Sequence, residues 1–204
     1  MSLQSGAMRL VLASASASRR ALLQAVGLSF DTCPADVDEA ALKRSARAEG
    51  LDAGEAAVLL ADAKALRVAC QHPEALIIGC DQLLVCDGRW FDKPADLDDA
   101  RTHLRALRGR THVLVTAVLC RRGDQRLWHT LARPCLTMRE FSDEFLEVYL
   151  CLEARHVTAT VGAYRLEGPG MHLFAAVDGD HAAILGLPML GLLGFLRQYG
   201  VLMA

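Results

Sequence analysis

The 204-residue sequence has no charge-free run of about 18 apolar residues, the length a transmembrane helix needs. Its longest candidate, residues 182–196, is interrupted by Pro188 and several glycines. No charged N-terminal segment followed by an apolar stretch indicates a secretory signal. The formal net charge is only −2, with both signs mixed along the chain, which argues against broad binding to nucleic acid polymers or anionic membranes. These absences predict a cytoplasmic protein with neither a membrane nor a nucleic acid as partner.

The sequence also lacks a cysteine framework. Its seven cysteines are an odd number, and no two of them have the C-x-x-C spacing of a metal or redox site. Several lie within apolar runs. Reduced, buried thiols are therefore expected rather than disulfides or a zinc site.

Strand and helix patterns alternate along the chain. Strands are predicted at residues 9–13, 28–33, 75–86, 111–120, 126–138 and 173–177, and helices at 19–26, 53–69, 189–199 and after the N-caps Asp96 and Ser142. Hairpin turns are predicted at Asp87-Gly88 and across residues 122–124. Hairpins among alternating strands and helices indicate an α/β fold with a mixed sheet.

The chain is long enough for one large domain or two closely joined lobes, and 52% hydrophobic residues supply ample core material. Residues 1–7 are interpreted as vector-derived residues ahead of a native start at Met8. They are excluded from the expected fold, which leaves 8–204 as a single domain.

A small, hydroxyl-rich turn follows the first strand. Ser14 and Ser16 lie in it, and Arg19 opens the predicted helix. Free backbone N–H groups and hydroxyl donors collect at a strand-to-helix junction of this kind, and an anion is their natural occupant. The turn therefore predicts phosphate binding.

Asp81 is the most informative single position, because it interrupts the apolar stretch 77–86. A carboxylate there is costly unless it is paired, hydrogen-bonded or metal-bound. Two interpretations stay open: a structural aspartate that pairs with a lysine, or a functional site.

Three further charged residues accompany it: Lys64 in an Ala-rich helix, Lys93 in a loop, and Glu39 in an acidic loop. Each alone is typical of a solvated surface. Together with Asp81 and the serine-rich turn they supply the parts of phosphoryl chemistry. Cations would neutralise phosphate charge, and two carboxylates could hold Mg²⁺ and orient a water molecule.

An ordered set of short motifs resembles the Maf family of nucleotide pyrophosphatases. The set runs from Met8 to the C-terminus: LASAS at 12–16 with RRALL at 19–23, DVDE at 36–39, AKA at 63–65, IGCDQ at 78–82, KP at 93–94, GRTH at 109–112, GAY at 162–164 with EG at 167–168, and GLP at 186–188. Any one of these motifs is weak, but their common order is specific.

The resemblance implies a two-lobed, mixed α/β, inosine-triphosphatase-like fold with a central cleft. It also implies a divalent metal, Mg²⁺ or Mn²⁺, and hydrolysis of a nucleoside triphosphate between the α and β phosphates. Asp81 would be the general base and would share the metal with Glu39. By the same resemblance Ser14, Ser16, Arg19, Lys64 and Lys93 would bind the phosphates.

Three positions separate the family's substrate branches. A branch that takes dTTP and UTP has arginine, threonine and glutamine there, and a 7-methyl-GTP branch has tryptophan, glutamine and glutamate. This sequence has Ser18, Gln82 and Glu167, so two of the three agree with the 7-methyl-GTP branch. Ala17 and Ser18 depart from the proline and tryptophan of that branch. A carboxylate suits guanine, because it accepts hydrogen bonds from N1–H and the amino group.

Other interpretations stay open. The same reaction on dTTP, UTP or CTP is one alternative. Another is a non-catalytic regulator of septum formation that acts by binding a partner. The resemblance also implies a house-cleaning role in nucleotide metabolism and a homodimer, although no heptad or exposed apolar stripe in the sequence indicates one.

Overall fold

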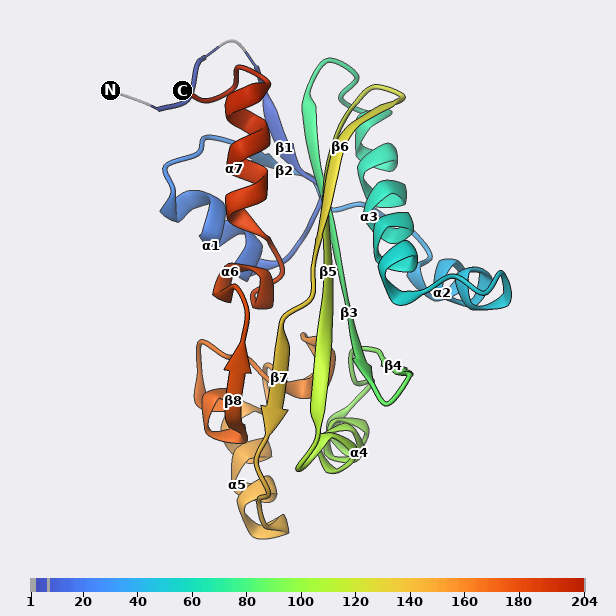
Figure 1. The fold of residues 1–204 in the computed structure, drawn as a ribbon, viewed down its shortest axis with the longest axis vertical. Helices are drawn as coiled ribbons and strands as arrows, with labels where there is room; N and C mark the ends of the chain where they lie inside the picture. Colours follow the sequence, from blue (N-terminus) through green and yellow to red (C-terminus); the bar gives the residue numbers. More distant parts are fainter. Residues whose placement is uncertain (1–2, 7, 204) are drawn as a thin grey trace. The chain divides into compact units, whose positions relative to one another are not determined.

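The computed structural model describes residues 3–6 and 8–203 (Figure 1). Its strands are β1 (Leu10–Leu12), β2 (Asp31–Thr32), β3 (Leu76–Cys86), β4 (Arg89–Phe91), β5 (Thr111–Arg122), β6 (Gln125–Ala132), β7 (Cys135–Met138) and β8 (Phe174–Asp178). Its α-helices are α1 (Ala17–Ala25), α2 (Glu39–Ala48), α3 (Ala53–Ala69), α4 (Leu97–Leu107), α5 (Asp143–Glu153), α6 (His181–Ile184) and α7 (Met189–Gln198). Two 3₁₀ turns, η1 (Val161–Ala163) and η2 (Pro169–Leu173), follow α5.

The strands form one mixed sheet, which confirms the predicted α/β class. The sheet order is β2-β1-β3-β5-β7-β8, with β4 paired to β3 and β6 to β5. Strand β1 is parallel to both β2 and β3, whereas the β3–β4, β5–β6, β5–β7 and β7–β8 pairs are antiparallel. The predicted hairpins are present, because β3 turns into β4 at Asp87-Gly88 and β5 into β6 at Gly123-Asp124.

The chain divides into two compact units. The first contains the residues up to Asp81, Thr116–Ala132 and the residues from His181 onward, and the second contains Gln82–Val115 and Arg133–Asp180. Strands β3 and β5 contribute to both units, since the boundary after Asp81 falls within β3 and the boundary after Val115 falls within β5.

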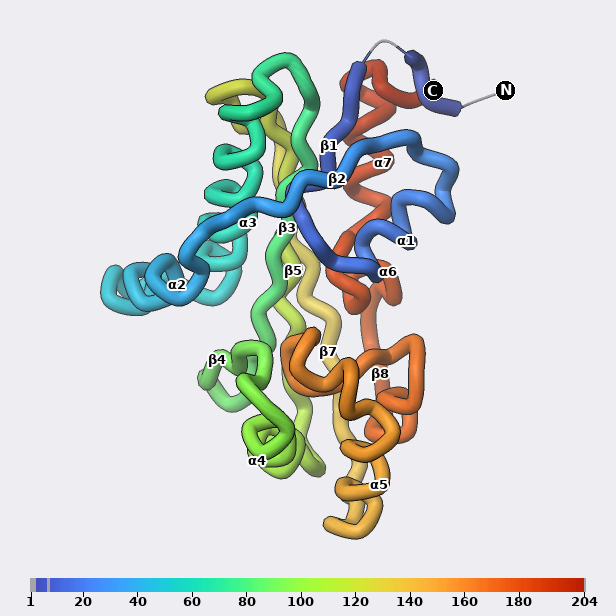
Figure 2. The backbone as a smooth tube through the Cα atoms, turned by 180° about the vertical axis from the view of Figure 1, so that it is seen from behind, coloured from blue at the N-terminus to red at the C-terminus, as the bar shows by residue number. Residues whose placement is uncertain are grey.

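The two faces of β3 in the first unit have different partners. Leu76, Ile78 and Cys80 join the core cluster that includes Leu23 of α1 and Leu192 of α7. Side chains alternate along a strand, so Ile77, Gly79 and Asp81 point the other way, toward α3. Figures 1 and 2 agree with this arrangement, with α1 and α7 on one side of these strands and α3 on the other.

Part of the segment 1–7 pairs with the last residues of the first unit, and its interpretation as vector-derived stays a prediction. Gln4 forms an isolated antiparallel bridge with Leu202. The Ser5 backbone N–H donates to the Val201 carbonyl at 2.9 Å. Backbone hydrogen bonding explains this pairing, for which residue type gives little signal. Residues 1, 2 and 7 of that interpretation lie outside the described residues.

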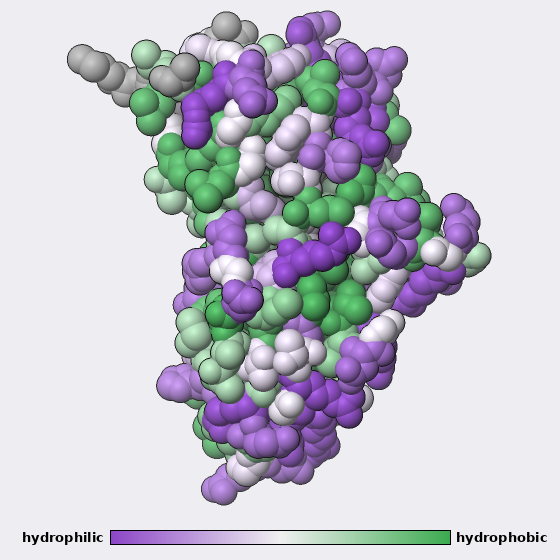
Figure 3. Space-filling view, in the orientation of Figure 1, coloured by the Kyte–Doolittle hydropathy of each residue, from purple (hydrophilic) through white to green (hydrophobic). Residues whose placement is uncertain are grey.

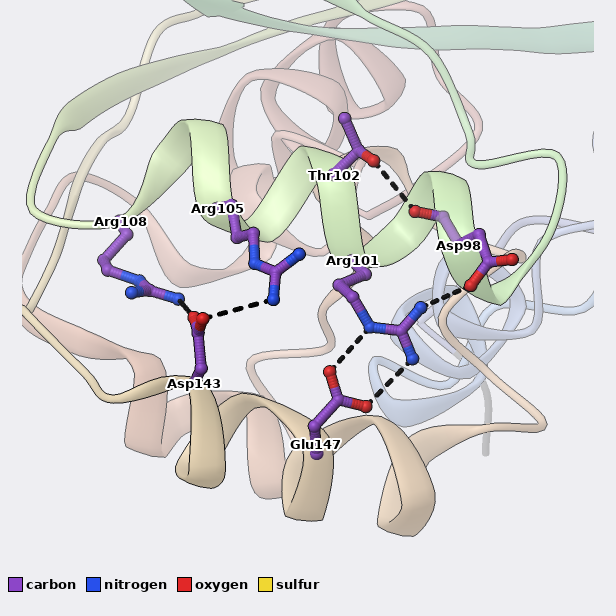
Figure 4. Close-up of polar contacts among 7 residues, drawn as sticks. All are labelled: Asp98, Arg101, Thr102, Arg105, Arg108, Asp143 and Glu147. Carbon is purple, nitrogen blue, oxygen red and sulfur yellow. Dashed lines mark hydrogen bonds and ion pairs between the residues drawn. The ribbon is translucent and has the colours of Figure 1, made fainter.

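In the second unit, α4 packs against α5 and is tied to it by ion pairs (Figure 4). Arg101 donates to both Glu147 oxygens, at 2.6 and 2.9 Å, and also pairs with Asp98. Asp143, in the first turn of α5, accepts from Arg105 and Arg108. Figure 3 shows hydrophilic residues gathered over these two helices. The link is therefore a largely exposed charge network.

Two elements differ from the prediction. The acidic stretch 36–39 was predicted as a loop, but its last residue, Glu39, is the first residue of α2. Asp38 caps that helix by accepting from the Ala41 N–H. The predicted strand 126–138 is two strands, separated at Arg133-Pro134. Proline has no N–H to donate to a sheet, which explains the break.

The seven cysteines all lie within the described residues and none forms a disulfide, as predicted. Three of them are buried: Cys80, Cys86 and Cys120. None of the helices formed by residues 3–6 and 8–203 has the length and apolar character that crossing a membrane requires.

Candidate functional site

The site begins with the close contact of α3 and β3. A Cβ atom at Gly79 would lie 2.5 Å from the Ala61 carbonyl oxygen and 2.7 Å from the Ala65 Cβ, so only glycine fits there. Asp81 is the next residue on that face of β3, and Lys64 precedes Ala65 on α3. The small residues therefore bring the backbones close enough for a lysine to reach a strand carboxylate.

Lys64 joins two carboxylates from different elements. Its Nζ lies 2.5 Å from Oδ1 of Asp81 and 2.8 Å from Oε1 of Glu39. The Asp81 side chain is 6% exposed and that of Lys64 is 11% exposed, whereas Glu39 is 41% exposed. The structure thus brings together three residues that the sequence predicted for the site. It places Glu39 at the solvent side of the cluster.

The charge state of Lys64 follows from this contact. Burial acts to lower the pKa of Lys64, but the carboxylates of Asp81 and Glu39 outweigh burial and raise its pKa above the usual value. Lys64 is therefore a fixed ammonium at neutral pH. One positive and two negative charges give the cluster a surplus of negative charge, which suits a divalent cation.

A second group of polar residues forms at the serine-rich turn. The Ser16 hydroxyl accepts from the Arg19 N–H at 3.4 Å and so caps α1. The helix starts at Ala17, two residues before the predicted start. The Ser14 hydroxyl accepts from the Ser16 N–H and from Nη1 of Arg19, each at 3.2 Å. Ser14, Ser16 and Arg19 therefore meet at the N-terminus of α1, where helix N–H groups favour an anion.

Backbone oxygens hold Arg19 in position, and one of them belongs to the residue before Asp81. Its Nε donates to the Gly186 carbonyl at 2.9 Å and its Nη1 to the Cys80 carbonyl at 3.2 Å. Gly186 has a φ of 97°, and a Cβ there would lie 3.0 Å from the Arg19 Nε. Since Cys80 precedes Asp81, this hydrogen bond links the serine-rich turn to the residues around Lys64.

Four predicted residues remain: Ser18, Gln82, Lys93 and Glu167. Ser18 lies in the first turn of α1 and is half-buried. Gln82, Lys93 and Glu167 belong to the second unit. Gln82 follows Asp81 in β3, Lys93 is exposed between β4 and α4, and Glu167 is exposed in the turn between η1 and η2.

The oxygen donors of the first unit fit a magnesium-type metal with few protein ligands. Among residues 3–6 and 8–203, no three or more His, Cys, Asp or Glu side chains gather as a metal site. Mg²⁺ commonly takes one or two carboxylates and completes its shell with water and substrate phosphates. Glu39 and Asp81, both within 2.8 Å of one Nζ, are such a pair.

His112, from the GRTH motif, is buried in the second unit. Its Nε2 lies 2.7 Å from the Tyr164 hydroxyl, and its ring contacts those of Tyr164 and Phe174. Burial lowers the pKa of His112 to about 4. The neutral imidazole is thus the native form, and this position contributes to the stability of the fold.

Acid should therefore destabilise the protein through His112. With a pKa of about 4 folded and about 6.5 unfolded, His112 contributes stability that is present above pH 6.5 and lost as the pH falls toward 4. Between pH 7 and pH 5 the free energy of unfolding should fall by about 2 kcal/mol through this group. Urea unfolding of wild type and His112→Gln at both pH values measures it. The fall should be smaller in His112→Gln and unchanged in His129→Gln, an exposed control.

Sequence reasoning missed the residues that hold the site residues in place. The Gly186 carbonyl, which accepts from Arg19, lies 167 positions away and carries no side-chain signal. The pair of Glu153 and Arg165 was also missed, although Glu153 ends the apolar run 148–152 of its helix and was a usable signal. Gly79 inside a strand was another such signal, because it indicates a close backbone approach.

The chain is an α/β protein whose first unit holds a serine-rich turn and a carboxylate–lysine cluster. Residues 9–199 match the model of the family described as Maf-like protein. A "Nucleoside triphosphate pyrophosphatase" of Granulibacter bethesdensis is 52% identical over 195 residues, 96% of this chain and 99% of the relative. Proteins of the same name from Rhodospirillum rubrum and Paramagnetospirillum magneticum are 53% and 48% identical, over 95% and 94% of this chain and 96% and 99% of theirs. The chain belongs to the Maf family, as the ordered motifs predicted.

Proposed function

We propose that this chain hydrolyses 7-methyl-GTP, or another modified purine nucleoside triphosphate, to the monophosphate and pyrophosphate. The pyrophosphatase reaction itself is supported by the relatives, which are named nucleoside triphosphate pyrophosphatases. They share about half of their residues with this chain over nearly their whole length. The chain is on that basis a hydrolase acting on acid anhydrides. The observation that carries the proposal is the Glu39–Lys64–Asp81 cluster beside the Arg19 turn.

Asp81 is proposed as the general base. Its buried carboxylate would accept a proton from the water that attacks the phosphorus, while pyrophosphate leaves with the bridging oxygen. Lys64 already donates to Oδ1, which fixes the orientation of the carboxylate. Glu39 and Asp81 would together hold Mg²⁺, and a bound Mg²⁺ would supply charge neutralisation of the phosphates.

The phosphates are assigned to the cations and hydroxyls. Arg19 and Lys93 would neutralise phosphate charge, and Ser14 and Ser16 would add hydrogen bonds at the α1 N-terminus. Lys64 would share its ammonium between Asp81 and the substrate. Arg19 is suited to this role because backbone carbonyls already orient its guanidinium, so little side-chain freedom is lost on binding.

Gln82 and Glu167 are the residues proposed to select the base of the nucleotide. The N1–H and amino group of guanine both donate, and a carboxylate accepts both. Methylation at N7 makes the base cationic, which a carboxylate also favours. Thymine and uracil present carbonyl acceptors on either side of one N–H, so a carboxylate at Glu167 disfavours them.

A nucleotide panel tests the proposal. Purified protein with Mg²⁺ is incubated with 7-methyl-GTP, GTP, dTTP, UTP and CTP, and pyrophosphate release gives kcat/KM for each. We expect 7-methyl-GTP to be hydrolysed best. Glu167→Gln should reduce its advantage over UTP by about tenfold or more, because a hydrogen bond to a charged group is worth roughly 1.5–3 kcal/mol. Equal selectivity in wild type and variant would reject the role of Glu167, and preference for a pyrimidine would move the protein to the other branch.

A further inference from the structure

An ion pair between the buried Glu153 and the half-buried Arg165 supports the turn that carries Glu167. Glu153, in the last turn of α5, is 4% exposed at its side chain and accepts from both Nε and Nη2 of Arg165, each at 2.9 Å. A two-point contact of this kind fixes the plane of the guanidinium as well as its distance. Arg165 is two residues before Glu167, so the pair anchors the start of the turn to a helix.

Gly168 and Gly170, which follow Glu167, pack closely against Arg165. A Cβ at Gly168 would lie 3.2 Å from Nη2 of Arg165, and one at Gly170 would lie 2.4 Å from the Arg165 carbonyl oxygen. The Gly168 N–H also donates to that carbonyl at 3.3 Å. Arg165 thus lies close to the chain directly after Glu167, through both its side chain and its backbone.

Hydrogen bonds from Tyr149 and Thr160 fix the segment before Arg165. Ala163 has a φ of 61°, unusual for a residue other than glycine. The buried Tyr149 hydroxyl of α5 donates to the Ala163 carbonyl at 3.0 Å, and Thr160 donates to the Tyr164 carbonyl at 2.9 Å. Strained backbone persists only where its surroundings over-determine it. Two residues of α5, Tyr149 and Glu153, therefore hold this path at Ala163 and at Arg165.

We propose that Glu153 and Arg165 are positioning residues for base recognition: their two-point ion pair holds the turn that presents the Glu167 carboxylate to the nucleotide base. The inference rests on the proposed function of Glu167 as the residue that reads the base. Glu153 and Arg165 themselves touch no substrate. The pair acts on binding and selectivity rather than on bond cleavage, because Asp81 and Lys64 belong to the other unit.

The variants Glu153→Gln and Arg165→Lys test the inference by the separation of KM from kcat. Each keeps side-chain size but loses part of the two-point contact. For the preferred nucleotide of the panel, we expect KM to rise by about tenfold with kcat nearly unchanged, since a hydrogen bond between charged groups is lost. Selectivity over the poorest nucleotide should fall in parallel.

A double-mutant cycle gives the decisive readout. If the pair acts through Glu167, Glu153→Gln should have no further effect on selectivity in a Glu167→Gln background. Additive effects, or equal losses of kcat for every nucleotide, would overturn the inference and leave the pair a merely structural one. Glu153→Asp, which keeps the charge, should recover part of the selectivity and serves where Glu153→Gln folds poorly.

Glu147→Gln is the matched control. It breaks another two-point Arg–Glu contact of the same helix, with Arg101 of α4 in place of Arg165. Its KM and selectivity should equal those of wild type. Wild type that hydrolyses no nucleotide would refute the proposed function, whereas a selective wild type with an equally selective Glu153→Gln variant would refute this inference alone.

Discussion

Asp81→Asn is expected to lower kcat for nucleoside triphosphate hydrolysis by about 10³-fold, within the range that general-base catalysis supplies. An asparagine has the shape of aspartate and can still accept from Lys64, but it cannot take a proton from water. The substitution should leave the surrounding structure unchanged, because Asp81 is buried and its strand packs closely against α3. Pyrophosphate release at saturating Mg²⁺ and nucleotide measures the effect.

Asp31→Asn is the control for Asp81→Asn. Asp31 also pairs with a cation, Arg9, at 2.7 Å in the same unit, but 57% of its side chain is exposed. Loss of the Asp31 charge in this variant should leave kcat unchanged. An Asp81→Asn variant that hydrolyses as fast as wild type would exclude Asp81 as the base. A large rise in the Mg²⁺ requirement with kcat recovered at high Mg²⁺ would instead assign Asp81 to the metal alone.

The sequence predicted the elements that periodicity and capping determine. Helix α3 was predicted with its observed bounds, and Asp96 and Ser142 cap α4 and α5 by accepting from backbone N–H groups. These features are local, because a cap needs only the next three residues. The split between β6 and β7 was missed although Pro134 was visible, since a long apolar pattern outweighed one residue that cannot donate to the sheet.

The candidate site was predictable in its members but not in its connections. Glu39, Lys64 and Asp81 were each singled out as charges, yet nothing in the sequence placed one ammonium between two carboxylates. That contact depends on how closely α3 approaches β3, which Gly79 and two alanines decide. The Arg19 contacts depend on carbonyls, which every residue has. Side-chain identity predicts which chemistry is available, and tertiary packing decides which groups meet.

The same cluster predicts an asymmetry in stability. Lys64→Met leaves the buried Asp81 carboxylate without its cation, and removing one partner of a buried ion pair typically costs about 3–5 kcal/mol. Asp81→Asn should cost less, because Lys64 keeps Glu39 at 2.8 Å and remains paired. We therefore expect Lys64→Met to be clearly the less stable of the two single variants. Urea unfolding at pH 7 measures both, followed by fluorescence of Trp128 in the first unit.

The double variant Lys64→Met/Asp81→Asn separates this explanation from a simple loss of packing. It removes both charges, so no unpaired buried carboxylate remains, and it should be more stable than Lys64→Met alone. Arg67→Met, an exposed position on the same helix, should be near wild type and controls for the apolar substitution itself. If the double variant is instead less stable than Lys64→Met, the lysine stem rather than its charge supports the fold. The ammonium between Asp81 and Glu39 would then be explained by substrate binding alone, because its charge would contribute nothing to folding.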